Sequence, residues 1–211
     1  LRVDSLEKAG EYIAKYIADH PDASDARLHY ARILFAQNAL LSAREQFRAL
    51  AAREPEESEH PYAAALISQQ IEDFDSAERE FRRALELKPR EPNPILHNLG
   101  LIAEAQHKPA AAVDWYRQVG TGEYYVNAQL RIAAIKAKQE GMEAGRKFLA
   151  EAQQAEFDNP DTRIQLILAE AQLLRDAKRH AEALAFLSEA VSRNPDTADL
   201  LYDRAMVAEK L

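Results

Sequence analysis

Residues 74–89 read FDSAEREFRRALELKP, an amphipathic helical pattern that ends in a proline. Residues 40–55 read LLSAREQFRALAAREP, and the second stretch follows the first at a distance of 34 residues. Both contain a serine, an alanine, a phenylalanine, an arginine and a proline at matching places: Ser42, Ala43, Phe47, Arg48 and Pro55, then Ser76, Ala77, Phe81, Arg82 and Pro89. Because all five identities keep one spacing, the sequence predicts an internal repeat rather than one isolated helix.

The prolines follow the same period. Pro21, Pro55 and Pro89 are 34 residues apart, and Pro160 and Pro195 are 35 apart. A proline cannot continue the hydrogen-bond ladder of a helix, so we expect helices to end at Pro21, Pro55, Pro89 and Pro195. Ahead of three of them lies a packing trio, spaced by four and three residues and therefore on one helix face: Ala43, Phe47 and Leu50; Ala77, Phe81 and Ala84; Ala183, Leu187 and Ala190.

A second helix is predicted between each proline and the next trio. In residues 93–119, NPILHNLGLIAEAQHKPAAAVDWYRQV, this helix carries the adjacent pair Leu99 and Gly100. Ala112, Tyr116 and Val119 follow as the next trio. A glycine inside a helix costs roughly 1 kcal/mol relative to alanine, so Gly100 indicates close contact with a neighbouring helix.

These residues resemble the tetratricopeptide repeat (TPR) family. Its unit of about 34 residues pairs a first helix carrying Leu-Gly with a second helix carrying an Ala-Phe-Ala trio and a closing proline. The resemblance implies an all-α fold, a right-handed α-α superhelix of stacked antiparallel helix pairs. A composition dominated by Ala, Leu, Glu, Arg and Gln favours the same class. The resemblance covers nearly the whole chain, which we expect to form a single solenoid over residues 1–211.

The repeat units are expected at about 24–57, 58–91, 93–126, 126–160 and 164–197, with half-units at 1–21 and 198–211. The first half-unit matches a second helix with Ala9, Ile13 and Tyr16 in the trio slots. The last half-unit matches a first helix with Ala205 in the small-residue slot.

The chain departs from the family pattern in places. The slot where the family favours Trp holds Arg27, Pro61, Leu96 and Ile167 instead. The unit at 126–160 is the weakest match, because no proline sits at its matching place, although its trio can be Gly145, Leu149 and Ala152. The stretch GTGEYY at 120–125 replaces the expected proline-closed turn and predicts a local irregularity there.

The bulk composition excludes several function classes. A formal net charge of −8 argues against a nucleic-acid partner, because phosphate neutralisation needs a basic surface. The absence of Cys excludes disulfides and thiolate catalysis. No segment reaches the ~18–20 uncharged apolar residues that a membrane span needs. The chain begins at Leu1 and starts and stops in mid-unit, so we expect a fragment of a bacterial TPR protein, either cytoplasmic or carried in the envelope by an upstream leader or anchor.

Catalytic motifs are missing, so no enzyme activity, metal or cofactor is expected. The six histidines form no close metal-ligand pair, and there is no phosphate-binding glycine loop or nucleophile elbow. His20 and His60 precede prolines and are expected in solvated turns, whereas His180 is expected to pack between helices. Asp73 and Asp75 lie in a turn, where they indicate either a solvated surface or a helix N-cap.

The resemblance implies that first helices line the concave face of the superhelix, where a peptide or partner helix binds. The candidate groove residues are mostly amphipathic: Arg32, Phe35, Tyr62, Leu66, Gln69, His97, Asn98, Leu101, Glu104, Gln172, Arg175 and Tyr202. Leu28, Gln165, Leu168, Met206 and Glu209 fall at matching inward positions. For any single member, the alternative is an ordinary half-buried surface residue.

One known clamp of the family holds the acidic C-terminus of heat-shock chaperones with Lys, Asn and Arg. The matching positions here offer Arg32, Asn98 and Arg175, which are scattered and interleaved with acidic residues. A carboxylate clamp is therefore not expected, and the acidic balance favours a neutral or basic ligand.

The leading hypothesis is a non-catalytic protein-interaction scaffold or adaptor that holds a peptide or partner protein in the groove. The first alternative is self-association into a homo-oligomer through uncapped terminal half-units. The second is a regulatory arm whose catalytic domain lies outside these residues.

Overall fold

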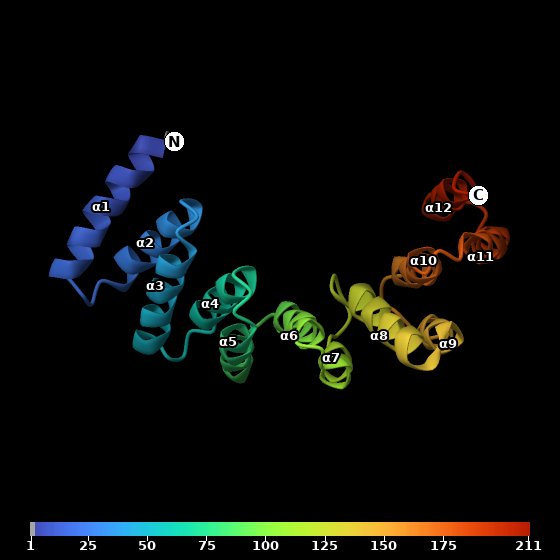
Figure 1. The fold of residues 1–211 in the computed structure, drawn as a ribbon, viewed down its shortest axis with the longest axis horizontal. Helices are drawn as coiled ribbons and strands as arrows, with labels where there is room; N and C mark the ends of the chain where they lie inside the picture. The colour runs from blue at the N-terminus through green and yellow to red at the C-terminus, as the bar shows by residue number, and fades with distance from the viewer. Residues whose placement is uncertain (1–2) are drawn as a thin grey trace. The chain divides into compact units, whose positions relative to one another are not determined.

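The structure is a computed structural model that describes residues 3–211, with side chains from Lys8 onward. The described residues contain α-helices and no strand (Figure 1). The helices, in chain order, are α1 (Val3–Asp19), α2 (Ser24–Ala36), α3 (Leu40–Arg53), α4 (Glu59–Gln70), α5 (Phe74–Glu86), α6 (Asn93–Ala105), α7 (Pro109–Tyr116), α8 (Tyr125–Glu140), α9 (Met142–Ala152), α10 (Asp161–Asp176), α11 (His180–Arg193) and α12 (Ala198–Ala208). The even-numbered helices are the first helices of the expected repeat units, and the odd-numbered ones are the second helices.

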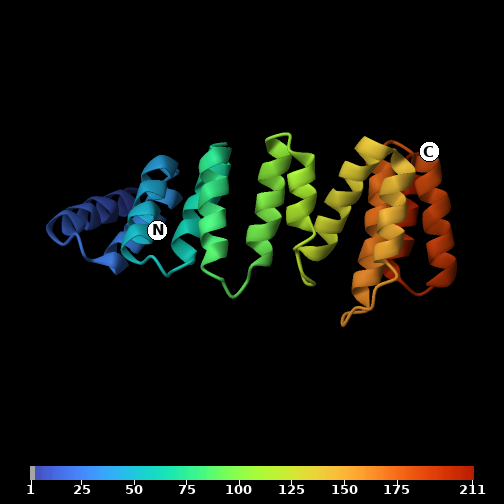
Figure 2. The ribbon, with the colours of Figure 1, turned by 90° about the horizontal axis from the view of Figure 1, so that it is seen from below.

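The chain divides into two compact parts, called here the N-terminal half (Leu1–Lys108) and the C-terminal half (Pro109–Leu211). In each half, short turns join consecutive helices, which lie side by side (Figure 2). The pairs α2 with α3, α4 with α5, and α8 with α9 make the most extensive helix contacts. Stacked antiparallel helix pairs are thus the building element of both halves.

One backbone device recurs in the turns after α2, α4, α6 and α10. Two residues past each of these helices, the backbone is left-handed, with φ of 60° at Asn38 and Glu72 and 59° at His107 and Lys178. The next amide then donates to the carbonyl five residues back, as Asp73 N does to Ser68 O at 2.9 Å. This bond satisfies a carbonyl that the helix end would leave unpaired.

The second-helix trios form the seams between helices, as the sequence predicts. Every member of the four clearest trios is buried: Ala43, Phe47 and Leu50; Ala77, Phe81 and Ala84; Ala112, Tyr116 and Val119; Ala183, Leu187 and Ala190. A small residue is buried at the equivalent place of each of five first helices: Ala31, Ala65, Gly100, Ala133 and Ala171. The small residues let neighbouring backbones approach, so the large trio member can fill the space between them.

The weakly matched unit is built around two glycines. Gly141 alone separates α8 from α9, and its φ of 100° is a conformation that favours glycine. Gly145 is buried where α9 touches α8, and a Cβ placed on it would lie 2.5 Å from the carbonyl oxygen of Ala133. The turn through Gly141 thus differs from the turns after α2, α4, α6 and α10, in which the left-handed residue lies two positions past the helix. The irregularity expected at 120–125 is also present, because α7 ends at Tyr116 and α8 begins at Tyr125.

Two expectations about local packing were wrong. In α1 Ile17 is buried, at 7 % exposure, whereas Tyr16 is 44 % exposed. The buried face of α1 is turned toward α2. A Cβ atom added to Gly10 on this face would lie 3.5 Å from Ile33 Cγ2. Ala205, expected in a small-residue slot, is exposed on α12.

His60 is also not solvated. It lies in the first turn of α4, buried, with Nε2 2.6 Å from the Oε2 atom of Glu54. The prediction failed because Pro61 sits near the start of a helix, where a missing amide hydrogen costs nothing, rather than after its end.

Candidate functional site

In the N-terminal half, the predicted groove residues are spread over the three first helices α2, α4 and α6. Phe35 and Leu66 are 47 % and 39 % exposed, and Arg32 is exposed as well. Tyr62 is half-buried with its ring 5.8 Å from that of Phe81, and it lines a hollow of about 310 Å³ beside Pro89. The other predicted positions are half-buried: Gln69, His97, Asn98, Leu101 and Glu104. Asn98 Nδ2 donates to the carbonyl of Pro94 at 2.8 Å and so serves its own helix.

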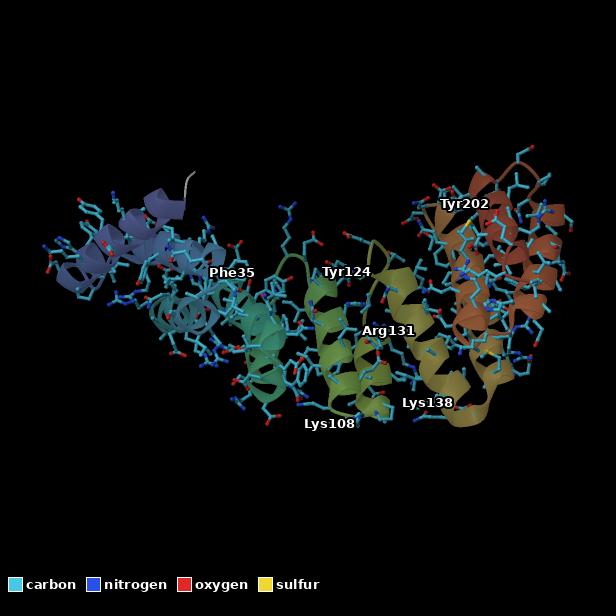
Figure 3. The ribbon with its side chains drawn as sticks, turned by 45° about the horizontal axis from the view of Figure 1, so that its top comes forward. Phe35, Lys108, Tyr124, Arg131, Lys138 and Tyr202 are labelled. Atoms are coloured by element: carbon cyan, nitrogen blue, oxygen red, sulfur yellow. The ribbon has the colours of Figure 1, made fainter. Side chains whose placement is uncertain are left out.

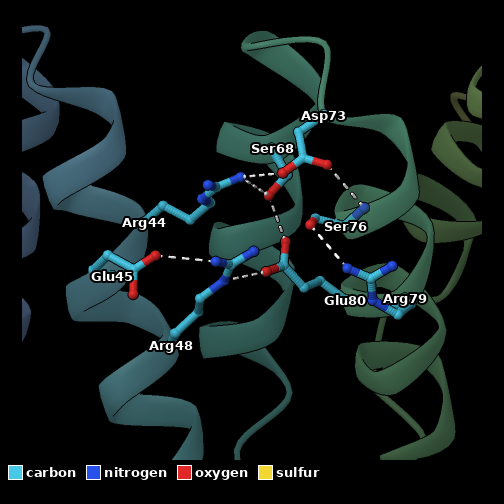
Figure 4. A network of polar contacts seen from close by, with 8 residues as sticks. All are labelled: Arg44, Glu45, Arg48, Ser68, Asp73, Ser76, Arg79 and Glu80. Carbon is cyan, nitrogen blue, oxygen red and sulfur yellow. Dashed lines mark hydrogen bonds and ion pairs between the residues drawn. The ribbon is translucent and has the colours of Figure 1, made fainter.

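Charged side chains of this half are engaged in a polar network between α3, α4 and α5 (Figure 4). Arg44 Nη1 donates to Asp73 Oδ2 at 2.7 Å and to Ser68 Oγ at 3.3 Å. Ser68 Oγ in turn donates to Glu80 Oε2 at 2.7 Å, and Arg48 Nε donates to Glu80 Oε1 at 2.6 Å. The network joins three helices and holds no unpaired carboxylate pair of the kind that acid–base catalysis uses.

Asp73 has the N-cap role that its position in the turn predicted. Its Oδ1 accepts a hydrogen bond from Ser76 N at 3.2 Å, at the start of α5. The hydrogen bond from Arg44 lowers the pKa of Asp73, and the bonds from Ser76 add to this effect. The carboxylate is therefore committed to structure rather than presented to a ligand.

The C-terminal half contains a groove of about 470 Å³. Three first helices supply its walls: Val126, Asn127 and Leu130 of α8; Gln165, Leu168, Ala169, Gln172 and Arg175 of α10; Asp199, Tyr202 and Asp203 of α12; and Glu123 just before α8. The structure therefore brings together Gln172, Arg175 and Tyr202, which the sequence assigned to one groove, with Gln165 and Leu168 of the matching inward positions.

The groove has an apolar floor and a charged rim. Leu130, Leu168 and Ala169 provide apolar surface, and Gln165 and Gln172 add amide groups that can hydrogen-bond a peptide backbone. Tyr202 is 68 % exposed on α12, and Figure 3 shows where it lies on this half. An amphipathic ring beside amide groups and apolar surface is suited to holding an extended chain.

Arg175 does not contribute a free positive charge to the groove. It forms an ion pair with Asp203 of α12, and both side chains are mostly buried. This pair links two first helices and neutralises the one basic side chain that lines the groove. A clamp for a terminal carboxylate would need that charge, which Asp203 already pairs.

A second hollow of about 340 Å³ adjoins the groove and shares Glu123 and Gln165 with it. Its remaining lining is mostly polar: Thr121, Gly122, Phe157, Asp158, Asn159 and Thr162. Together the two hollows form one longer path along the first helices of this half. We call this path the acidic groove, because its lining includes Glu123, Asp158, Asp199 and Asp203.

Sequence reasoning missed the α8 side of the acidic groove. Glu123, Val126, Asn127 and Leu130 were not proposed, because the unit at 126–160 lacked a clear register. The signal that could have been used is Gly141, which marks the end of α8 and so identifies α8 as the first helix of its pair.

No group of three or more His, Asp and Glu side chains from the described residues is arranged to hold a metal ion. Within the same residues, no helix is both long and apolar enough to cross a membrane.

Comparison with known proteins places the chain in a family. The sequence matches the model of the tetratricopeptide repeat over residues 2–59 and 62–123, more than half of its length. The chain belongs to the tetratricopeptide repeat family. The fold class predicted from the sequence, an all-α TPR superhelix of stacked helix pairs, is thereby confirmed together with the resemblance. TPR proteins are, as a family, protein-interaction modules, and this chain is a scaffold of that general kind.

Two curated bacterial relatives share sequence with this TPR chain. TPR repeat-containing protein PA4667 of Pseudomonas aeruginosa is 36% identical over 113 residues, which are 54% of this chain. Cellulose synthase 2 operon protein C of Komagataeibacter xylinus is 26% identical over 203 residues, which are 89% of this chain. The matched regions span 19% and 14% of those relatives' own lengths.

Solved structures share the TPR fold at low sequence identity. MamA aligns with a TM-score of 0.61 and 15% identity over 70% of this chain and 86% of its own. PilF of Pseudomonas aeruginosa aligns with a TM-score of 0.59 and 16% identity over 99% of this chain and 91% of its own. YrrB, described as a TPR protein with an unusual peptide-binding site, aligns with a TM-score of 0.57 and 17% identity over 96% of this chain and 100% of its own. This likeness shows the architecture alone.

Proposed function

We propose that this TPR chain is a non-catalytic adaptor whose acidic groove binds an extended peptide segment of a partner protein. The observation that carries the proposal is the convergence of three first helices, α8, α10 and α12, on one hollow of about 470 Å³. An extended segment can cover apolar floor, bond its backbone to Gln165 and Gln172, and lie against Tyr202. The peptide-binding site named for YrrB supports this type of ligand by analogy.

The other features of the chain fit an adaptor without its own chemistry. The described residues contain no metal-binding cluster, and their buried charges are paired within the helix seams. The acidic composition supports a protein rather than a nucleic acid as the partner.

The test uses a display library of random peptides panned on the whole chain. Gln172→Trp should block the groove, because Gln172 is exposed on α10 and lines the hollow. Gln139→Trp is the matched control, since Gln139 is exposed on α8 and does not line the groove. Peptides enriched by the wild-type chain and by Gln139→Trp, but not by Gln172→Trp, would support the proposal. Equal capture by both tryptophan variants would contradict it.

A second candidate function is self-association through α12. Leu201 and Met206 are 37 % and 38 % exposed, and Leu211 beyond the helix is 67 % exposed, so apolar side chains are available for a partner helix. Sedimentation at increasing concentration tests this candidate: the wild-type chain should associate, and Leu201→Glu should weaken the association. A wild-type chain that stays monomeric at high concentration would exclude it.

A further inference from the structure

The charges along the acidic groove are not balanced by its own residues. Of its carboxylates, Asp203 is paired with Arg175. Glu123, Asp158 and Asp199 are exposed and form no ion pair with any described residue. The path therefore presents three uncompensated negative charges to whatever enters it.

These charges sit where they influence a ligand most. The floor of the groove is partly apolar, through side chains such as Leu130 and Leu168. Because the effective dielectric constant beside such a surface is lower than that of bulk water, the attraction between a charge at the rim and a charge on the ligand is stronger there. A concave surface lined by one sign of charge raises the local concentration of ligands of opposite sign. A basic ligand is therefore favoured over a neutral or acidic one.

One position on α12 combines two features that recognise a cation. Asp199 and Tyr202 are three residues apart on the helix and so share one face, and both line the groove. The exposed ring of Tyr202 can stack against a guanidinium or ammonium group while the Asp199 carboxylate pairs with it. Neither group is committed elsewhere in the way that Arg175 and Asp203 are.

We propose that the acidic groove selects extended protein segments that contain Lys or Arg, with one basic side chain held between Tyr202 and Asp199. The proposal rests on the function proposed above and adds the chemical class of its ligand. The adjoining hollow at Glu123 and Asp158 gives a second acidic stretch along the same path, so a segment with two spaced basic residues binds better than a segment with one. Nucleic acids are excluded by the sign of the charge, and a small cation would leave most of the path unfilled.

The experiment extends the peptide selection with charge variants that keep side-chain shape. The chain is panned as wild type, as Asp199→Asn, as the double variant Glu123→Gln with Asp199→Asn, and as Asp196→Asn. Asp196 is exposed, precedes α12 and does not line the groove, so it is the matched control for loss of one negative charge. Selected peptides are then labelled and titrated against these chains and against Tyr202→Leu by fluorescence anisotropy at low and high salt.

The proposal expects wild-type selection to enrich Lys and Arg. Binding of an enriched peptide should weaken by about two- to fivefold in Asp199→Asn, and by a similar factor in Tyr202→Leu, because each removes one of the two groups that contact the cation. The double variant should bind less tightly still and show a smaller salt dependence. Asp196→Asn should bind as the wild type does.

Four results would overturn it. Enrichment of peptides without a bias toward Lys and Arg would contradict the charge selection but not the proposal that the groove binds peptides. Binding of basic peptides by the double variant as tightly as by the wild-type chain would have the same meaning. An equal loss of peptide affinity in Asp196→Asn and Asp199→Asn would mean that the net charge of the chain, rather than the charges in the groove, determines binding. Absence of any enrichment over Gln172→Trp would remove the peptide groove itself and the charge selection with it.

Discussion

Arg44 in the N-terminal half and Arg146 in the C-terminal half occupy the same place in the repeat, one residue after the small member of a trio. Arg44 reaches forward to Asp73, whose side chain is 38% exposed, whereas Arg146 Nε donates to Glu170 Oε1 at 3.1 Å, and the Glu170 side chain is 4% exposed. Gln153 Nε2 donates to the other Glu170 oxygen at 3.0 Å. The same arginine position thus pairs with a partly exposed carboxylate in one half and with a buried carboxylate in the other.

The two carboxylates respond in opposite directions. The hydrogen bond from Arg44 lowers the pKa of Asp73, whereas burial raises the pKa of Glu170 despite its bonds to Gln153 and Arg146. Burial dominates for Glu170 because the free energy of desolvating its ionised carboxylate exceeds the stabilisation of that charge by one partly exposed arginine. A recurrent seam can therefore hold a carboxylate where the ion pair favours its charged form, as at Asp73, or where burial disfavours that form, as at Glu170.

The largest expected effect concerns how closely a neighbouring helix approaches a helical glycine in each half. Gly145→Ala should destabilise the chain by about 2–3 kcal/mol, because the added Cβ would lie 2.5 Å from a backbone oxygen and 2.9 Å from Ala137 Cβ. Gly10→Ala should instead stabilise it by about 1 kcal/mol, since the new Cβ meets Ile33 at an ordinary 3.5 Å in a helix interior. Urea unfolding of both variants measures the two signs. A shift in the same direction for both would contradict this account of the seams.

The next effect concerns Glu170, which precedes the small residue Ala171 of α10. The residues at the equivalent place are Tyr30, which is half-buried, and Ala64, Leu99 and Ile132, which are buried and apolar. Glu170→Ala should cost about 2 kcal/mol, because it leaves a cavity and removes the partner of Arg146 and Gln153.

Glu170→Leu should stay within about 1 kcal/mol of wild type, since leucine fills the slot as Leu99 does and Arg146, 27% exposed, can turn toward water and Glu143. Thermal unfolding at neutral pH compares the two variants. A leucine variant as unstable as the alanine variant would show that the ion pair itself, rather than the filled volume, supports the seam.

The smallest effect is the pH dependence of the two carboxylates. Glu170 has a raised folded pKa, so its contribution is most favourable below its usual value of 4.5 and is lost as pH rises through the folded pKa. Asp73 has a lowered pKa, so its contribution is present above its usual value of 3.8 and is lost as pH falls through the folded pKa.

The measurement is the free energy of unfolding from pH 3 to pH 7 for Glu170→Gln and for Asp73→Asn, each compared with wild type. The two comparisons isolate the pH-dependent contributions of Glu170 and Asp73. The wild-type advantage should shrink with rising pH in the first comparison and with falling pH in the second. Parallel slopes would mean that the two ion pairs do not differ as described.

The repeat, its helices and its seams were predictable because they follow from spacing. Ala77, Phe81 and Ala84 are buried as their positions on one helix face required, and the period located the helix pairs in both halves. What spacing does not encode is which side of a helix has a neighbour. Tyr16 was misassigned for that reason, and its face is exposed because α1 turns Ile17 toward α2.

The site was predictable in part. Gln172, Arg175 and Tyr202 were found because first-helix positions can be counted from a clear trio, whereas Glu123 and Leu130 belong to a unit whose register depends on Gly141 rather than on a proline. The pairing of Arg175 with Asp203 was beyond reach, because it depends on the rotation of α12 against α10. Glu170 was equally hidden, since a slot that holds Leu or Ile elsewhere gives no reason to expect a charge.

The left-handed turns have a practical consequence for engineering the chain. Glu72, His107 and Lys178 hold a backbone conformation that side chains with a Cβ adopt at a cost of about 1 kcal/mol, while Asn38 is of the type that tolerates it. These positions lie in turns, outside the lining of the acidic groove. Glycine or asparagine at Glu72 and Lys178 would raise the melting temperature without altering the surface a partner meets, and so would supply a sturdier backbone on which ligand selectivity could be redesigned.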